Sequence, residues 1–275
     1  MEVKIITDST VDLREELKKQ LKIVPLTVHF GEEEYIDGVT MTQRQFYEKL
    51  EKSDALPSTS QATPDAFMQV FEQIKQAGQS AVVLTLSSKL SGTYQSAMIA
   101  AVEYENIYVV DTDSVAIGSG ILAELALQLA DAGMDAKAIA RRLEEEKKNV
   151  RIIAMVDTLE YLKRGGRVSK TVAFAGGLLN IKPVLSVAEG QIQILGKARG
   201  IKQGSKMLLE QIEETGGVDF SKPVMLAYTG LEDAHLKKFM EENEAFREMP
   251  YGLIGSVIGT HAGPGAVAIA FFICG

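Results

Sequence analysis

An almost unbroken apolar run, Ala81–Leu86, is the feature that most restricts the fold of this chain. A strand with apolar side chains on both faces has to be covered on both faces, as the strands of parallel sheets are. Residues 3–6 and 107–110 are two more short apolar segments, and a helical pattern follows each of the three. This alternation predicts a mostly parallel sheet with helices on both faces. In such sheets ligands bind at the carboxyl ends of the strands, where Asp, Ser and Thr are frequent in this chain.

The second half of the chain has a different pattern, with neighbouring strands joined by short turns. Strands over 181–187 and 191–195 flank a plausible hairpin turn, and strands over 252–258 and 266–273 are expected on either side of the sequence HAGPG. These patterns predict a mostly antiparallel sheet. The fold class is therefore α/β in two domains, a mostly parallel N-terminal α/β sandwich and a C-terminal α+β domain. The boundary is expected near residue 150, which gives domains 1–150 and 151–275.

Four local patterns in the first half predict individual elements. A helix is expected over about residues 12–21, and one continuous strand over residues 23–30. The pair Thr42–Gln45 is a capping-box pattern at the start of a helix. A cap followed by proline at Thr63–Pro64 predicts the start of another helix.

Composition excludes several classes of function. A net charge of −8 argues against non-specific binding to nucleic acid or to anionic membranes, which requires a basic surface. No apolar run approaches the roughly 18 residues that span a bilayer, and the first residues lack the pattern of a signal peptide. One cysteine and three scattered histidines do not form a metal-binding pattern. A cytoplasmic protein without a metal site is expected.

Three short polar turns are the strongest candidates for a functional site. They are Thr59–Gln61, Ser91–Thr93 and His261–Gly265, and each lies where an apolar strand or helix begins or ends. None carries a carboxylate, so together they can supply neutral hydrogen-bond donors to one small anionic head group. This composition favours holding a ligand over breaking one.

Each turn also has a purely structural interpretation. Ser91 precedes a predicted helix start, where free N–H groups favour an anion, but it is equally a plain helix cap worth about 1 kcal/mol. Thr59 and Ser60 are compatible with an ordinary polar surface turn. The glycines and proline of HAGPG suffice for a hairpin turn, although they leave the imidazole of His261 unexplained. Both interpretations stay open for all three turns.

Three arginines, Arg164, Arg167 and Arg199, are the other notable charges. Basic residues usually form a solvated face, whereas the planar guanidinium also suits docking of a carboxylate or phosphate. The sequence lacks the phosphate loop GxxxxGK[ST], the nucleophile elbow GxSxG and the zinc motif HExxH. A hydrolytic triad of Ser91 and His261 with Asp8 or Asp113 can be written down, but the spacing does not support it.

The order of motifs along the chain resembles that of one known family. The motifs are ITDSTVDL, PSTSQATP, LSSKLSGTYQSA, DTDS, LEYLKRGGRVS, LLNIKPVL, GKARG and THAGPGAVAI. Single motifs of this kind are weakly specific, but their joint order covers nearly the whole chain. The sequence resembles the DegV family of bacterial fatty-acid-binding proteins, which includes the binding subunit of fatty acid kinase.

The resemblance implies a fatty-acid site between the two domains, with the tail buried. By motif match, Thr59, Ser91 and His261 would bind the carboxylate of the long-chain fatty acid. Further candidates for head-group contact or partner docking are Ser60, Gly92, Thr93, Arg167 and Arg199. The resemblance implies no catalytic residue, no metal and no cofactor beyond the bound fatty acid.

The resemblance also implies a partner. A separate ATP-dependent kinase would phosphorylate the bound carboxylate, and the acyl-phosphate would enter phospholipid synthesis. Two other functions stay open: a lipid carrier or sensor without a kinase partner, and a hydrolase or acyl transferase that uses Ser91 and His261.

Several apolar residues are candidates for a tail pocket, although each could equally belong to the core. They are the segment 172–179 together with Met98, Ile117, Ile121 and Phe271.

Overall fold

The computed structural model describes residues 2–53, 55–168 and 180–274. In these residues, the N-terminal half contains the strands β1 (Val3–Asp8), β2 (Lys22–Val24), β3 (Thr27–Phe30), β4 (Glu33–Ile36), β5 (Ser58–Ser60), β6 (Ser80–Thr85) and β7 (Ile107–Asp111). Its helices are α1 (Glu15–Lys18), α2 (Gln43–Lys52), α3 (Pro64–Gln76), α4 (Thr93–Ala101), α5 (Ala116–Asp131) and α6 (Ala136–Glu146), followed by the 3-10 helix η1 (Lys147–Asn149).

The C-terminal half continues from there. Its strands are β8 (Val150–Met155), β9 (Ile181–Ala188), β10 (Gln191–Arg199), β11 (Met225–Tyr228), β12 (Tyr251–Leu253) and β13 (Val267–Phe272). Its helices are α7 (Glu160–Arg164), α8 (Gly200–Glu214), α9 (Ala234–Glu242) and α10 (Ser256–Ala262), with the 3-10 helix η2 (Glu244–Phe246).

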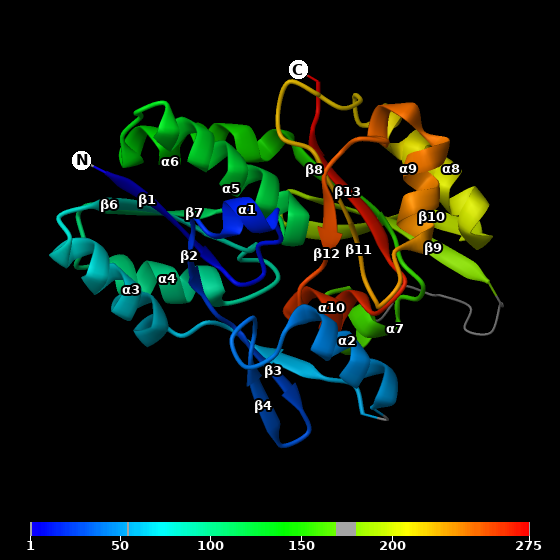
Figure 1. Cartoon of the computed structure of the whole chain (residues 1–275), viewed down its shortest axis with the longest axis horizontal. Helices are drawn as coiled ribbons and strands as arrows, with labels where there is room; N and C mark the ends of the chain where they lie inside the picture. Colours follow the sequence, from blue (N-terminus) through cyan, green and yellow to red (C-terminus); the bar gives the residue numbers. More distant parts are fainter. Residues whose placement is uncertain (1, 54, 169–179, 275) are drawn as a thin grey trace.

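A parallel sheet with the order β2-β1-β6-β7 forms the centre of the N-terminal half. Helices α5 and α6 lie on one face of this sheet and α3 and α4 on the other (Figure 1). The run 80–85 of β6 is buried at every position, as a doubly covered strand should be. The predicted parallel α/β arrangement is confirmed.

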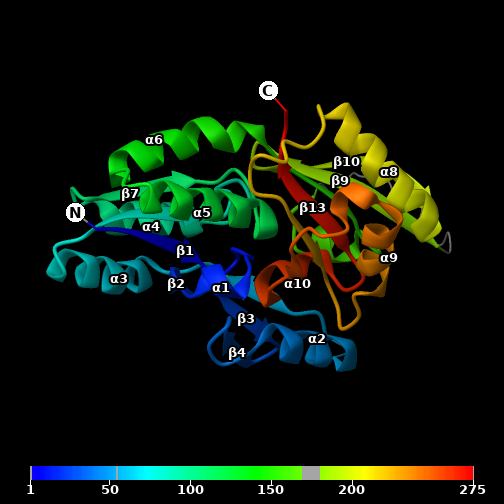
Figure 2. The same cartoon turned by 45° about the horizontal axis from the view of Figure 1, so that its top comes forward.

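The C-terminal half builds a second sheet with the order β10-β9-β8-β13-β11-β12. All of its pairs are antiparallel except β11 with β12, which confirms the predicted mostly antiparallel sheet. Helix α5 packs on one face of this sheet, and α8 and α9 cover the other (Figure 2). Because α5 contacts both sheets, it belongs to a core that the two halves share. The domain boundary at residue 150 stays a prediction.

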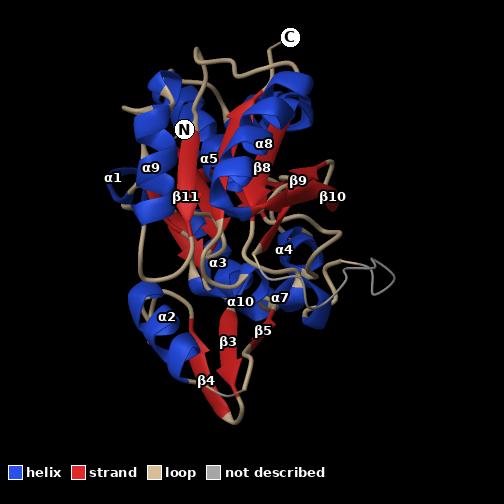
Figure 3. Cartoon of the chain, turned by 90° about the vertical axis from the view of Figure 1, so that its right-hand side faces the viewer, coloured by secondary structure: helices blue, strands red, loops and turns tan. Residues whose placement is uncertain are grey.

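A third, small sheet with the order β4-β3-β5 projects from the N-terminal half. Figure 3 shows it beneath α2 and α10. The prediction of one strand over 23–30 is wrong here, because β2 joins the parallel sheet while β3 joins the small antiparallel one. Pro25 lies between them, and proline, which has no N–H group, interrupts a strand ladder.

The prediction of a strand over 252–258 is also wrong. Strand β12 ends at Leu253 and helix α10 begins at Ser256, so His261 lies in the last turn of a helix and not in a hairpin. A short apolar run fits a buried strand and a buried helix equally well, and tertiary contacts decide between them. The helix expected over 12–21 is shorter than predicted and covers only Glu15–Lys18.

The two predicted caps are confirmed. The Thr42 side chain accepts a hydrogen bond from the Gln45 backbone N–H, and Gln45 completes the capping box of α2. Thr63 caps α3, with Pro64 in its first turn. The predicted hairpin also forms, since Glu189 and Gly190 have φ values of 51° and 74° between β9 and β10. Such values suit the two-residue turns that match strand twist.

Candidate ligand-binding site

A cavity of about 370 Å³ is lined by residues from both halves of the chain. Its wall is mostly apolar and comes from the second sheet, from α5 and from α10. Representative wall residues are Ile117, Ile152, Ala154, Leu185, Val187 and Ile258. This volume lies within the range of about 300–1,000 Å³ that is typical of small-molecule sites.

The three polar turns lie together at this cavity. Thr59, Ser91 and His261 all line it, although they are far apart in sequence. Thr59 Oγ1 lies 3.0 Å from His261 Nε2, which joins the first turn to the third. The second turn meets the first at Gly92, because a Cβ atom at that position would overlap the side-chain amide of Gln61. Glycine is therefore required there for close packing.

His261 is held as a neutral imidazole. Its Nε2 bonds with Thr59, whereas its buried Nδ1 has no hydrogen-bond partner among the described residues. Burial lowers the pKa of His261 to about 4, and the nearby Arg167 guanidinium lowers it further in the same direction. Desolvation and a like charge both disfavour the imidazolium. The ring therefore offers one neutral N–H group and one lone pair at neutral pH.

Ser91 lies immediately before helix α4. Its Oγ lies 3.0 Å from Thr93 Oγ1 and accepts the Thr93 backbone N–H at 3.3 Å. The N-cap residue of α4 is Gly92, which has no side chain that could cap the helix. Ser91 therefore takes over part of the capping and also lines the cavity, and its ligand-binding role stays a prediction.

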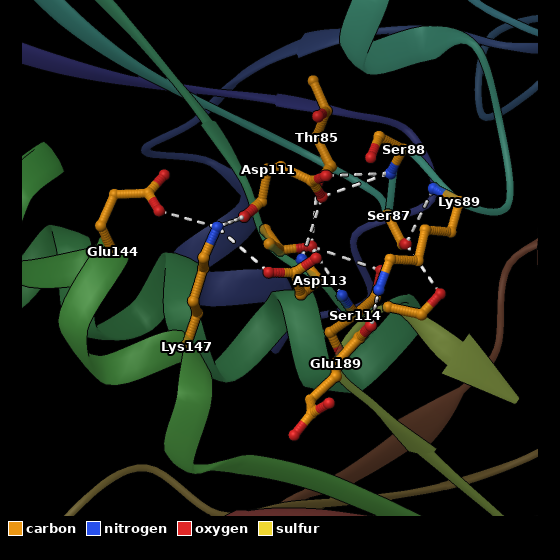
Figure 4. Close-up of polar contacts among 12 residues, drawn as sticks. Thr85, Ser87, Ser88, Lys89, Asp111, Asp113, Ser114, Glu144, Lys147 and Glu189 are labelled. Carbon is orange, nitrogen blue, oxygen red and sulfur yellow. Dashed lines mark hydrogen bonds and ion pairs between the residues drawn. The ribbon is translucent and has the colours of Figure 1, made fainter. Parts of the chain in front are cut away.

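The loop that presents Ser91 is fastened at several points (Figure 4). The Ser87 backbone N–H donates to the Ser114 carbonyl at 2.8 Å. The Ser88 backbone N–H donates to the Asp111 carboxylate at 3.2 and 3.3 Å. Strand β7 and the turn after it therefore fix the loop that follows β6.

The tip of the β9–β10 hairpin holds the same loop from the other half of the chain. Ser87 Oγ donates to the Gly190 carbonyl at 2.9 Å, and Lys89 Nζ donates to the Glu189 carbonyl at 2.7 Å (Figure 4). The Gly190 N–H donates to the Asp113 carbonyl at 2.8 Å. These hydrogen bonds join the two halves beside the cavity.

Lys147 neutralises the acidic side chains around this junction. Its Nζ lies 3.1 Å from Asp113 Oδ2 and 2.7 Å from Glu144 Oε2, and it donates to the Asp111 carbonyl (Figure 4). The ammonium group of Lys147 therefore balances the negative charges of Asp113 and Glu144 at this junction.

The remaining predicted residues differ in position. Arg167 lines the cavity, and its guanidinium donates to the Leu90 carbonyl at 3.1 Å and to the Gly165 carbonyl at 2.5 Å. Ser60 also lines it, but its Oγ is bonded to His29 Nε2 at 2.8 Å. Thr93 is buried behind Ser91 and does not line the cavity.

Arg199 is exposed at the end of β10 and lies outside the cavity lining. Its backbone N–H donates to Gln203 Oε1 at 2.7 Å at the start of α8, and Arg199 pairs with Ile181 in the β9–β10 ladder. A head-group contact for Arg199 is therefore not supported by the geometry of this structure.

The apolar candidates for a tail pocket lie in different surroundings. Ile117 lines the cavity, whereas Ile121 and Phe271 belong to the packed core and Met98 is 39% exposed. The segment 172–179 lies outside the described residues.

Sequence reasoning gave no binding role to four polar residues near the site, although Gln61 belongs to the first candidate turn and Asp8 was considered for a triad. Gln61 lines the cavity and donates to Ser96 Oγ, and Thr229 lines it directly after the end of β11. Asp8 and Asp12 are buried carboxyls after β1, with exposed fractions of 0% and 2%. The sequence signal for them was the motif ITDSTVDL, in which two acids follow a buried strand.

Two further properties of the described residues bear on the class of site. None of the described helices combines the length and the apolar character needed to cross a membrane. Within the same part of the chain, no cluster of His, Cys, Asp and Glu side chains is placed to hold a metal ion.

Comparison with known proteins shows the family of this chain. A family model described as "Uncharacterised protein, DegV family" matches residues 2–273. A DegV domain-containing protein of Caldanaerobacter subterraneus is 36% identical over 280 residues, covering 98% of each chain.

Solved structures show the same likeness. A DegV family protein from Thermus thermophilus, described as binding fatty acid, superposes with a TM-score of 0.87 at 31% identity and covers 99% of this chain and 100% of its own. DegV from Bacillus subtilis, described as a fatty acid binding protein, gives 0.84 at 31% identity with full coverage of both chains. The family match, spanning nearly every residue, shows that this chain belongs to the DegV family.

Proposed function

We propose that this protein binds one long-chain fatty acid, with the tail in the apolar cavity and the carboxylate at Thr59, Ser91 and His261. The observation that carries the proposal is that these three side chains line one mostly apolar cavity. The relatives from Thermus thermophilus and Bacillus subtilis are both described as fatty-acid-binding proteins. A relative from Eubacterium ventriosum, 28% identical with a TM-score of 0.85, is described as binding stearic acid.

The polar end of the cavity suits a carboxylate. Thr59 and Ser91 supply hydroxyl donors, and His261 supplies a neutral N–H group. Arg167 adds a positive charge to the lining while its own N–H groups are partly occupied by carbonyls. A buried carboxylate needs such partners, because an unpaired one would cost more than a lost hydrogen bond.

The apolar wall supplies the affinity. A C16 tail has about 14 methylenes, whose burial is worth roughly 0.8 kcal/mol each, or about 11 kcal/mol in total. Association costs of several kcal/mol reduce this sum. The remainder supports tight but reversible binding between the two predicted domains, 1–150 and 151–275.

We further propose that the protein is a non-catalytic subunit that presents the fatty acid to a separate ATP-dependent kinase. In that reaction a carboxylate oxygen attacks the γ-phosphorus of ATP, ADP leaves, and the acyl-phosphate serves phospholipid synthesis. Neutral donors at Thr59 and Ser91 leave more electron density on the carboxylate than a tight ion pair would.

The geometry does not favour the hydrolase alternative. The Ser91 hydroxyl is hydrogen-bonded to the hydroxyl and the backbone N–H of Thr93, whereas His261 Nε2 is hydrogen-bonded to Thr59. A nucleophilic serine needs a base within hydrogen-bond reach. With a pKa of about 4, the His261 imidazole is also a weak base for catalysis at neutral pH.

Native mass spectrometry of the purified protein tests the binding proposal. We expect a mass excess of one fatty acid, and palmitate should rebind after solvent extraction. Ser91→Ala should weaken palmitate affinity by about tenfold, because a hydrogen bond to a charged group is lost. Ser88→Ala, an exposed serine in the same loop, is the matched control and should bind as the unaltered protein does. Protein that stays empty with a panel of C12–C20 acids would overturn the proposal.

A reconstituted assay tests the kinase proposal separately. The loaded protein is incubated with ATP and a purified bacterial fatty acid kinase, and acyl-phosphate is trapped as the hydroxamate. Product that requires both proteins supports presentation to a kinase. Normal fatty-acid binding without any product would favour a carrier or sensor.

A further inference from the structure

The start of helix α10 is held by a buried carboxyl from the opposite end of the chain. Both oxygens of Asp12 accept the backbone N–H of Gly255, at 3.0 and 3.2 Å. Gln43 Nε2 donates to Asp12 Oδ1 at 3.2 Å and steadies the carboxylate. Asp12 is 2% exposed, so this contact is made away from water.

The carbonyl of the same peptide unit is held as well. Tyr47, which is fully buried, donates its hydroxyl to the Ile254 carbonyl at 3.1 Å. The peptide between Ile254 and Gly255 therefore has both of its polar groups fixed by side chains of the N-terminal half.

The body of α10 is packed as tightly as its start. A Cβ atom at Gly259 would lie 2.5 Å from Tyr47 Oη and 2.9 Å from Phe46 Cε1, so the helix lies directly against α2. All three cartoon views place α10 beside α2 (Figures 1, 2 and 3). The helix thus has little freedom to move relative to the N-terminal half.

This helix carries part of the ligand site. Val257, Ile258, His261 and Ala262 line the cavity. At 1.5 Å per residue, His261 lies roughly 9 Å along the helix from Gly255. A small rotation or slide at Gly255 would therefore move the imidazole relative to Thr59.

We propose that Asp12 is a positioning residue of the ligand site, whose carboxylate fixes the start of α10 and thereby holds His261 against Thr59. The expected effect on ligand affinity rests on the proposed fatty-acid binding, whereas the hydrogen bonds of Asp12 to Gly255 do not. Asp12 does not line the cavity, so its effect on a ligand must pass through α10.

The surroundings of Asp12 allow its charge to change in the neutral range. Burial raises its pKa to about 7, with Asp37 and Glu15 acting in the same direction and Lys18 and the Gly255 N–H opposing. The charged carboxylate makes the stronger hydrogen bond to Gly255. The hold on α10 should therefore be firmest above neutral pH and weaker below it.

The first test is the palmitate affinity of Asp12→Asn, measured by calorimetry between about pH 5.5 and about pH 8.5. We expect about tenfold weaker binding than the unaltered protein at the alkaline end, because a charge-assisted hydrogen bond becomes a neutral one. The ratio of the two dissociation constants should fall towards one at the acidic end. Titration of palmitate itself cancels in this ratio. Equal affinities at every pH would overturn the proposal.

Glu146→Gln is a matched control for the loss of a buried carboxylate. Glu146 is 5% exposed, pairs with Arg142 and Lys222 and does not line the cavity. Its substitution should lower stability without changing the affinity ratio with pH. A pH-dependent affinity loss equal to that of Asp12→Asn would assign the effect to general destabilisation and overturn the proposal.

Proton NMR of the three histidines separates this inference from the proposed function, since it needs no ligand. The His261 ring resonance should show a small step near pH 7 as Asp12 ionises, in addition to its own protonation at lower pH. Asp12→Asn should abolish this step, whereas Asp8→Asn, which removes the other buried carboxyl of the motif, should keep it.

The unaltered protein alone keeps the proposal testable if Asp12→Asn fails to fold. Absence of the step near pH 7 in that protein would contradict it. A step without any palmitate binding would uphold the positioning role and count against the fatty-acid function. Tyr47→Phe, which releases the carbonyl side of the same peptide, should shift the His261 resonance in the free protein.

Discussion

At the residue scale, the central fact is that a half-buried histidine is kept uncharged next to an arginine. His261 and Arg167 line the same cavity, and burial with the neighbouring charge lowers the pKa of His261 to about 4. A neutral ring donates one hydrogen bond without forming an ion pair. The site can thus hold a carboxylate through neutral donors while one cation lies nearby.

Arg167→Gln should raise the pKa of His261, because one of the two causes that lower it is removed while burial stays. Palmitate affinity should fall, since a positive charge is lost from the cavity lining. The His261 resonance over a pH series and calorimetry measure the two effects. Arg199→Gln is the matched control, because Arg199 is exposed and outside the lining. An unmoved His261 pKa in Arg167→Gln would show that burial alone sets it.

At the element scale, the two halves meet where the tip of the β9–β10 hairpin contacts the loop after β6. Gly190 donates to Asp113 and accepts from Ser87, and its φ of 74° lies in the left-handed region. A Cβ atom there would lie 2.6 Å from Ser87 Oγ. Glycine meets both the conformational and the steric requirement at this junction.

Gly190→Ala should therefore destabilise the protein by more than backbone strain alone. Gly133→Ala supplies the comparison, because Gly133 has a φ of 82° but no atom within 4 Å of an added Cβ. We expect a loss of about 1 kcal/mol for Gly133→Ala and about 2–3 kcal/mol for Gly190→Ala. Urea unfolding measures both. Equal losses of unfolding free energy in the two variants would mean that the hairpin tip shifts to accommodate the added Cβ atom without destabilising the protein.

At the scale of the whole molecule, the two sheets share one core through α5 and one cavity. The N-terminal half contributes Thr59 and Ser91 to the cavity lining, and the C-terminal half contributes His261 and most of the apolar wall. Neither half has the complete site. Buried carboxyls near this junction connect the stability of the whole chain to pH.

Stability should fall as the pH rises from about 4 to about 7. Burial raises the pKa of Asp8 from 3.8 to about 6 and that of Asp12 to about 7. A raised pKa in the folded state means that stability is fully present below the unfolded pKa and is lost as the pH rises through the folded one. His261, with its lowered pKa, acts oppositely: its contribution is lost as the pH falls from 6.5 towards 4.

Urea unfolding at several pH values measures this trend. Asp8→Asn should remove about 2 kcal/mol of the decline between pH 4 and 7, from the displacement of one pKa from 3.8 to about 6. Ser88→Ala should keep the full decline. An Asp8→Asn protein with an unchanged pH dependence would show that Asp8 does not ionise in the folded state as burial suggests.

The sequence by itself determined the features that depend on neighbours along the chain. Apolar runs and caps at Thr42 and Thr63 specified a parallel α/β half and a mostly antiparallel one, and motif order identified the family. The residues Thr59, Ser91 and His261 were also selected from sequence, with help from the resemblance, and their carboxylate role stays a proposal.

Only the tertiary structure decided what depends on contacts between distant residues. It made 256–262 a helix, and it placed the peptide before this helix against Asp12 and Tyr47, which lie more than 200 positions away in sequence. It placed Arg167 in the cavity and Arg199 outside, although both are arginines with glycines close by in sequence. It also set the pKa of His261, since burial and the position of a neighbouring charge are properties of the packed chain and not of a local pattern.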